Sequence, residues 1–170
     1  MDKLIDIFLT EQLALRLERE ISNQMDEVIG NKVKPISQKF SIASKDKKSP
    51  FRNVLAVATD SSSSLEVIKN YIRYQVGRKE SSPIWKTSKD SELFAQAVVN
   101  DLQNLSQDAQ EIVQRLRRAI PKGNSLEPYL EDNQNREKIK KDIHLKLAQL
   151  YLGYLAREHT ASVGESKPNQ

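Results

Sequence analysis

The stretch from residue 63 to residue 77, SSLEVIKNYIRYQVG, decides the fold class of this chain. Ser63 stands three residues before Glu66, the spacing of a helix capping box, and Gly77 is a residue on which helices commonly end. Between them, apolar residues recur at steps of three and four, which places them on one helical face: Leu65, Ile68, Ile72 and Val76. The stretch therefore predicts an amphipathic helix that begins at Leu65.

The same apolar spacing recurs on both sides of this helix. A first helix runs to about residue 29, where Gly30-Asn31 is a suitable stop, and the turn Pro121-Lys122-Gly123-Asn124 separates later helices. The other predicted helices are a short piece over 50–57, one that starts at Asp90-Ser91, one capped by Ser106 and Asp108, and a last one over 136–157. Residues 126–130 form either the first turn of that last helix or a separate piece.

No stretch alternates apolar and polar residues long enough to require a strand, and no internal repeat is present. We therefore predict an all-α fold, a compact bundle of about five helices with a basic loop after the first. The expected organisation is a single helical domain over 1–159, with the loop at 31–50 and a disordered tail over 160–170.

Composition excludes several classes of protein. The 170 residues contain no cysteine, which excludes a disulfide framework, thiolate metal sites and thiol catalysis. Uncharged runs are too short to cross a membrane, and the acidic start of the chain does not fit a secretory signal peptide, so we expect a cytoplasmic protein. Five glycines are too few for a phosphate-binding loop.

Charge is unevenly distributed along the chain. Residues 1–31 hold three bases and seven acids, whereas residues 32–52 hold seven bases and one acid. A second basic stretch from Lys69 to Lys89 holds six bases and one acid. Blocks of one sign favour a surface that faces a polyanion, although a lysine-rich solvated loop is the simpler interpretation of 32–52.

Residues suited to catalysis are scarce. The two histidines, His144 and His159, lack a partner at the four-residue spacing of a helical zinc site. No glycine-flanked serine suggests a nucleophile elbow, and the acidic pairs fit solvated faces or caps. We therefore expect a protein that is not an enzyme and needs neither a cofactor nor a metal.

The outer face of the helix over 65–77 has the character of a binding site. Lys69 and Arg73 lie four residues apart and project together, and further bases close the helix and follow it. Cations bind phosphates and exposed rings stack on unpaired bases, so we predict nucleic-acid contact by Lys69, Arg73, Tyr74, Arg78, Lys79 and Lys86. Trp85 offers a further ring, but in a chain poor in aromatic residues a core position is the commoner role.

Two stretches carry a family resemblance. The run IKNYIRYQVGR over 68–78, with Trp85 and Phe94 after it, resembles the small helical subunit of type III CRISPR effector complexes. The run LAQLYLGYLAR over 147–157 is similar to the closing helix of such subunits. The likeness covers roughly residues 63–157, more than half of the chain.

The resemblance implies a non-catalytic subunit of an antiviral ribonucleoprotein complex. Copies of such a subunit line the channel that holds guide RNA paired with target nucleic acid, and they contact its backbone and the other effector subunits. Carried to this chain, the implied contacts are Lys69, Arg73, Arg78, Arg115, Arg118 and Lys122. The acidic first helix and the basic segment at 32–52 make this chain longer than the compact version of the family.

A second hypothesis comes from a different class of protein. The apolar and charged helix faces also fit an adaptor that binds another protein and no nucleic acid. Replacing Arg73 and Arg78 with glutamate separates the two hypotheses, because only an RNA-binding subunit would lose RNA.

Overall fold

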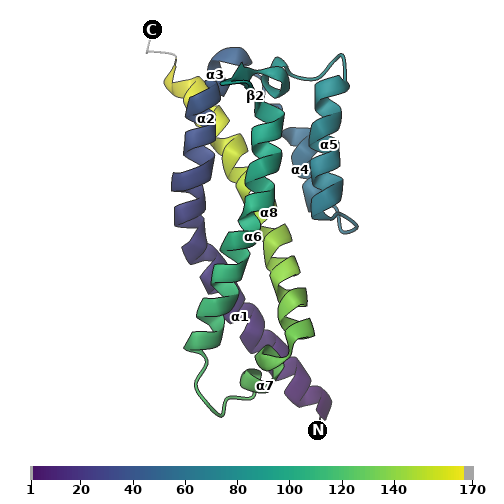
Figure 1. The fold of residues 1–170 in the computed structure, drawn as a ribbon, viewed down its shortest axis with the longest axis vertical. Coiled ribbons are helices and arrows are strands. Elements are labelled where there is room, and N and C mark those ends of the chain that lie inside the picture. Colours follow the sequence, from purple (N-terminus) through teal and green to yellow (C-terminus); the bar gives the residue numbers. More distant parts are fainter. Residues whose placement is uncertain (1, 167–170) are drawn as a thin grey trace. The chain divides into compact units, whose positions relative to one another are not determined.

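Helices form nearly all of the regular structure in this chain (Figure 1). The computed structural model describes residues 2–166, with side chains from Ile7 onward. In chain order the elements are α1 (Asp2–Val28), η1 (Ile29–Val33), α2 (Lys34–Phe40), α3 (Ile42–Lys45), α4 (Arg52–Thr59), α5 (Leu65–Gly77), η2 (Pro83–Lys86), β1 (Ser88–Lys89), β2 (Glu92–Leu93), α6 (Phe94–Ala119), α7 (Leu126–Glu131) and α8 (Asn133–Glu165). The predicted all-α bundle is confirmed.

The chain groups into two compact units. Unit 1 comprises Met1–Asp26 and Leu105–Leu147, and unit 2 comprises Glu27–Asn104 and Ala148–Gln170. Because α1, α6 and α8 each supply residues to both units, this division does not test the single domain expected over 1–159, which stays a prediction.

The loop predicted at 31–50 is wrong over most of its length, because the chain is helical to Lys45 except at Ser41, which separates α2 from α3 at a φ of 49°. The helical stop predicted at Gly30-Asn31 is also wrong: η1 is a π-helix, in which the backbone N–H of Lys34 bonds to the carbonyl of Ile29. The wider turn adjusts the backbone just before Pro35, which stands in the first turn of α2, where its missing N–H is tolerated. Buried apolar side chains keep the segment on the core: Val33, Ile36, Phe40 and Ile42.

Three other boundaries differ from the prediction. Ser106 and Asp108 do not start a new helix, because α6 is continuous and its buried residues Leu105 and Ala109 lie on either side of them. Helix α8 continues to Glu165, so the tail predicted as disordered from residue 160 is helical that far, and residues 167–170 lie outside the described part. The N-cap of α5 is Ser64, whose hydroxyl accepts from the Val67 backbone N–H, rather than Ser63.

A short antiparallel hairpin was not predicted. Strands β1 and β2 pair Ser88 with Leu93 and Lys89 with Glu92. The two-residue turn between them places Asp90 and Ser91 at φ values of 51° and 64°, the geometry that tight hairpin turns require. Two residues per strand are too few to give an alternating sequence signal.

Aromatic rings form the centre of unit 2. The ring of Phe51 packs edge-on against Trp85 at 5.6 Å and against Phe94 at 6.3 Å, and Phe40 meets Phe94 at 5.4 Å. Each such pair adds about 0.5–1.5 kcal/mol beyond the burial of its area. These contacts fix α2, the start of α4, η2 and α6 around one core, which positions the surface described next.

Membrane-spanning character is absent from the described helices: none of them is both long and apolar enough to cross a bilayer.

Candidate nucleic-acid interface

Positive charge is concentrated in unit 2. Of the 27 Lys and Arg residues, 15 fall in unit 2, against 10 of the 23 acids, which gives it a net charge of +5. Unit 1 holds the other 12 bases and 13 acids, a net charge of −1. Unit 2 also contains six of the nine residues predicted to bind nucleic acid. The net positive charge of the chain therefore lies in the same unit as most of the predicted site.

Lys69 is engaged within unit 2. Its Nζ lies 2.8 Å from Glu66 Oε1 and 2.8 Å from Gln103 Oε1, and only 18% of its side chain is exposed. A lysine held between a carboxylate and an amide has given up much of its capacity to bind phosphate. The structure therefore separates Lys69 from Arg73, with which it was expected to project.

The outer face of α5 keeps exposed groups that can bind nucleic acid. Arg73 is exposed, and Tyr74 is 57% exposed, with its ring centroid 6.2 Å from that of Tyr71. An exposed ring beside an exposed guanidinium combines a stacking surface with a phosphate-binding cation. Lys79 and Lys86, which follow along the chain, are exposed as well.

Arg78 differs from these surface cations because it is partly buried. It is the C-cap residue of α5, and its Nε is buried without a hydrogen-bond partner among the described residues. An unpaired buried donor costs about 1–3 kcal/mol, so such a group is unusual in a folded protein unless a ligand completes it.

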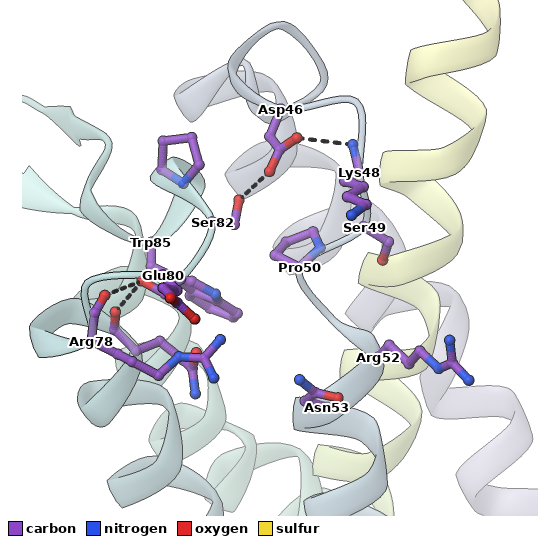
Figure 2. A pocket seen from close by; sticks show the side chains of 13 residues that line it. Asp46, Lys48, Ser49, Pro50, Arg52, Asn53, Arg78, Glu80, Ser82 and Trp85 are labelled. Carbon is purple, nitrogen blue, oxygen red and sulfur yellow. Dashed lines mark hydrogen bonds between the residues drawn. The ribbon is translucent and has the colours of Figure 1, made fainter.

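Arg78 lines a cavity of about 590 Å³ in unit 2, which we call the α4–α5 cavity. Its lining comes from both basic stretches of the sequence: Asp46, Lys48, Ser49, Pro50, Arg52, Asn53, Gln75, Arg78, Glu80, Ser81, Ser82, Pro83 and Trp85. Figure 2 shows Arg78 and Asn53 directed toward each other across the hollow, while the guanidinium of Arg52 points away from Arg78. Lys48, Arg52 and Arg78 thus surround one cavity although the sequence separates them.

Hydrogen bonds join the two walls of this cavity. The Asp46 carboxylate accepts from the Ser82 hydroxyl at 2.7 Å and from the Lys48 backbone N–H at 3.0 Å (Figure 2). The carbonyl of Asp46 accepts from His159 Nε2 at 2.7 Å, and the His159 ring packs edge-on to Phe51 at 6.1 Å. Both loops that line the cavity are therefore held in place, and His159 is a buried anchor in α8.

Trp85 belongs to the core. Only 1% of it is exposed, and its ring contacts Phe51 and Phe94, each with a centroid distance of 5.6 Å. The residue forms part of the cavity wall, but it is not a free stacking platform for bases.

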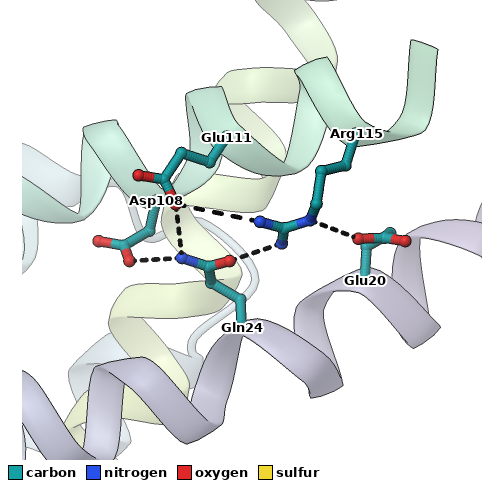
Figure 3. A network of polar contacts seen from close by, with 5 residues as sticks. All are labelled: Glu20, Gln24, Asp108, Glu111 and Arg115. Carbon is teal, nitrogen blue, oxygen red and sulfur yellow. Dashed lines mark hydrogen bonds and ion pairs between the residues drawn. The ribbon is translucent and has the colours of Figure 1, made fainter. Parts of the chain in front are cut away.

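In unit 1 the three predicted contacts have different surroundings. Arg115 lies in a polar network: its Nε is 2.9 Å from Glu20, and it also donates to the buried Gln24, whose amide donates to Asp108 and Glu111 (Figure 3). An arginine bound in this way supports the packing of unit 1, so we leave Arg115 out of the interface. Arg118 and Lys122 are exposed.

The residues that sequence reasoning missed are Lys48, Arg52 and Asn53. The basic run at 32–52 was a visible signal, but nothing in it shows which of its cations meet Arg78. His159 was expected to stand at the end of the helical domain, just before the tail predicted at 160–170, and it is buried, with 1% of it exposed. His159 is buried because α8 continues as a helix past it, and the polar sequence at the end of α8 does not predict this burial.

Comparison with protein-family models, with curated proteins and with solved structures finds no match to this chain.

Proposed function

We propose that this chain is a non-catalytic helical subunit of an RNA-guided ribonucleoprotein complex, in which unit 2 binds the phosphate backbone of nucleic acid. The observation that carries the proposal is the convergence of cations from two distant basic stretches on one surface of unit 2. Lys48 and Arg52 come from the first stretch, and Arg78 comes from the second. Phosphate contacts by Lys and Arg supply most of the sequence-independent affinity for nucleic acid.

The finer part of the proposal comes from the sequence resemblance. It assigns the chain to the small subunit of type III CRISPR effector complexes, in the cytoplasm, with guide RNA, target nucleic acid, other effector subunits and copies of itself as partners. The exposed cations of unit 2 would contact the backbone directly: Lys48, Arg52, Arg73, Lys79 and Lys86. The exposed ring of Tyr74 would stack on an unpaired base. Arg118 and Lys122 are the corresponding exposed cations of unit 1.

The direct test is RNA affinity as a function of salt. Fluorescence anisotropy with a labelled single-stranded RNA is measured between 50 and 300 mM KCl for the full chain and for the variant R73E/K79E/K86E. Loss of three phosphate contacts lowers the slope of log K against log salt by about 2, at about 0.7 per phosphate for single strands. We expect the variant to bind at least 30-fold more weakly at 100 mM KCl.

A matched control variant separates the effect of where the charges lie from the effect of net charge. The variant K138E/K141E/K146E changes the charge by the same amount at exposed positions of α8 in unit 1. We expect it to bind RNA within threefold of the unaltered chain. Equal losses in both variants would mean that RNA responds to net charge alone, and this would refute an interface on unit 2.

A second candidate function, a protein adaptor, is favoured by apolar side chains on α1. Ile7, Phe8 and Leu15 are 57%, 58% and 68% exposed. Exposed apolar groups of this size commonly mark protein contacts. If the chain is only an adaptor, I7S/F8S/L15S will release its protein partners from a native purification, and the unaltered chain will show no RNA binding in the anisotropy measurement.

A further inference from the structure

We infer that the α4–α5 cavity binds a single ribonucleotide, either free or as one unit of a bound strand. This inference rests on the proposed function, because it names the ligand unit that the basic surface of unit 2 would accept. The volume of about 590 Å³ lies within the range of small-molecule sites in proteins, about 300–1,000 Å³.

The phosphate end of the site is Arg78. Its Nε is a buried donor with no partner among the described residues, and its guanidinium points into the hollow in Figure 2. Arginine presents a planar fork of donors that matches phosphate oxygens. Lys48 and Arg52 also line the cavity and make its rim basic, although the Arg52 guanidinium points away from Arg78 (Figure 2).

The acidic residues of the lining select a nucleotide over a simple polyanion. Both carboxylate oxygens of Asp46 already accept hydrogen bonds, from Ser82 and from the Lys48 backbone. Glu80 is exposed and lines the same cavity, so it can accept from ribose hydroxyl groups. A carboxylate in this place repels a second phosphate but suits the sugar of a nucleotide.

The apolar and amide side chains of the lining would contact the base of the nucleotide. Pro50, Pro83 and Trp85 supply apolar surface, and Asn53 directs its amide into the hollow opposite Arg78 (Figure 2). An amide offers both a donor and an acceptor to the edge of a base. The bonds from Asp46 to Ser82 and from His159 to Asp46 hold these walls in place before a ligand arrives.

The single tryptophan of the chain makes the test simple, because Trp85 lines the cavity. Intrinsic fluorescence of the full chain is titrated with AMP, GMP, CMP and UMP, and separately with adenosine, inorganic phosphate and a phosphoserine peptide. We expect a saturable change with the nucleoside monophosphates, and at least tenfold weaker binding of adenosine and of phosphate.

Three variants locate the ligand. R78A should weaken mononucleotide binding at least tenfold, and R78K, which keeps the charge and guards against misfolding, should recover part of the loss. N53L should weaken binding at least threefold. K34A, an exposed lysine of α2 outside the cavity, is the control and should leave the affinity unchanged.

The outcomes separate this inference from the proposed function. No saturable change with any mononucleotide, equal binding of phosphate alone, or tighter binding of the phosphopeptide would each overturn the nucleotide site. None of these results alters the RNA measurement on R73E/K79E/K86E, whose positions lie outside the cavity lining. Conversely, mononucleotide binding without RNA binding would refute the proposed function and still support the nucleotide site.

Discussion

Tyr151→Phe tests a hydrogen bond that a fully buried tyrosine makes within unit 2. Tyr151 is fully buried, and its hydroxyl donates to Asp101 Oδ2 at 2.7 Å. Burial raises the pKa of the Asp101 carboxyl above its ordinary value of 3.8, and the bond from Tyr151 acts in the opposite direction. The variant therefore leaves a partly buried carboxylate without its donor and creates almost no cavity.

The expected loss of stability in Tyr151→Phe follows from the negative charge on Asp101, which accepts the hydrogen bond. A hydrogen bond to a charged group contributes about 1.5–3 kcal/mol, so the free energy of unfolding at pH 7 should fall by about that amount. For a chain of this size the loss corresponds to a drop in Tm of about 3–12 °C. Urea denaturation followed by circular dichroism at pH 7 measures it. A change below about 0.5 kcal/mol would refute the assigned bond, since it lies in the lower part of the range of about 0.2–1 kcal/mol that exposed pairs contribute.

Asp101→Asn supplies the matched control and a dependence on pH. The asparagine carbonyl still accepts from Tyr151, and no charge is buried. Because the native-state pKa of Asp101 is raised, the folded protein binds the proton more tightly than the unfolded chain does. The stabilising effect of that proton is present below pH 3.8 and is lost as the pH rises through the raised pKa. The unaltered chain should therefore gain stability relative to Asp101→Asn as the pH falls from 7 toward 3.8.

Three further predictions concern local structure. Ser64→Ala removes the cap that accepts from the Val67 N–H, and thermal denaturation should show a loss of about 1 kcal/mol. Gly123→Ala should cost about 1 kcal/mol in the same assay although no atom would contact the new methyl group, because φ is +86° there; an unchanged Tm would contradict that turn geometry. Arg115→Ala removes the hydrogen bond to the buried Gln24 and the ion pair with Glu20, and should lower the free energy of unfolding by about 1–3 kcal/mol in urea, while RNA affinity stays within threefold.

The sequence predicts helices well where the apolar stripe is long. Over 65–77 the stripe, the glycine and the serine caps agree with one another, and the observed α5 covers the same residues. The turn at 121–124 was equally clear, because proline and glycine restrict the backbone there. These signals are local, so they do not depend on what the helix packs against.

The failures share one physical cause, which is that tertiary packing overrides a local signal. Between Ile29 and Lys45 the glycine, proline and lysines indicate a loop, yet four buried apolar side chains and a π-helical turn keep the segment helical. The cavity was beyond prediction for a related reason. Arg78 and Arg52 line one cavity only because the aromatic core places the start of α4 beside the end of α5.

The most direct test of nucleic-acid binding by unit 2 is ultraviolet crosslinking of the natively assembled, affinity-purified protein, with the crosslinked peptides identified by mass spectrometry. The account predicts RNA in the purified complex, with crosslinks at Tyr74 and within residues 46–53 and 78–86. Crosslinks confined to residues 7–26 and 105–147, or protein partners that co-purify without RNA at low salt, would contradict it.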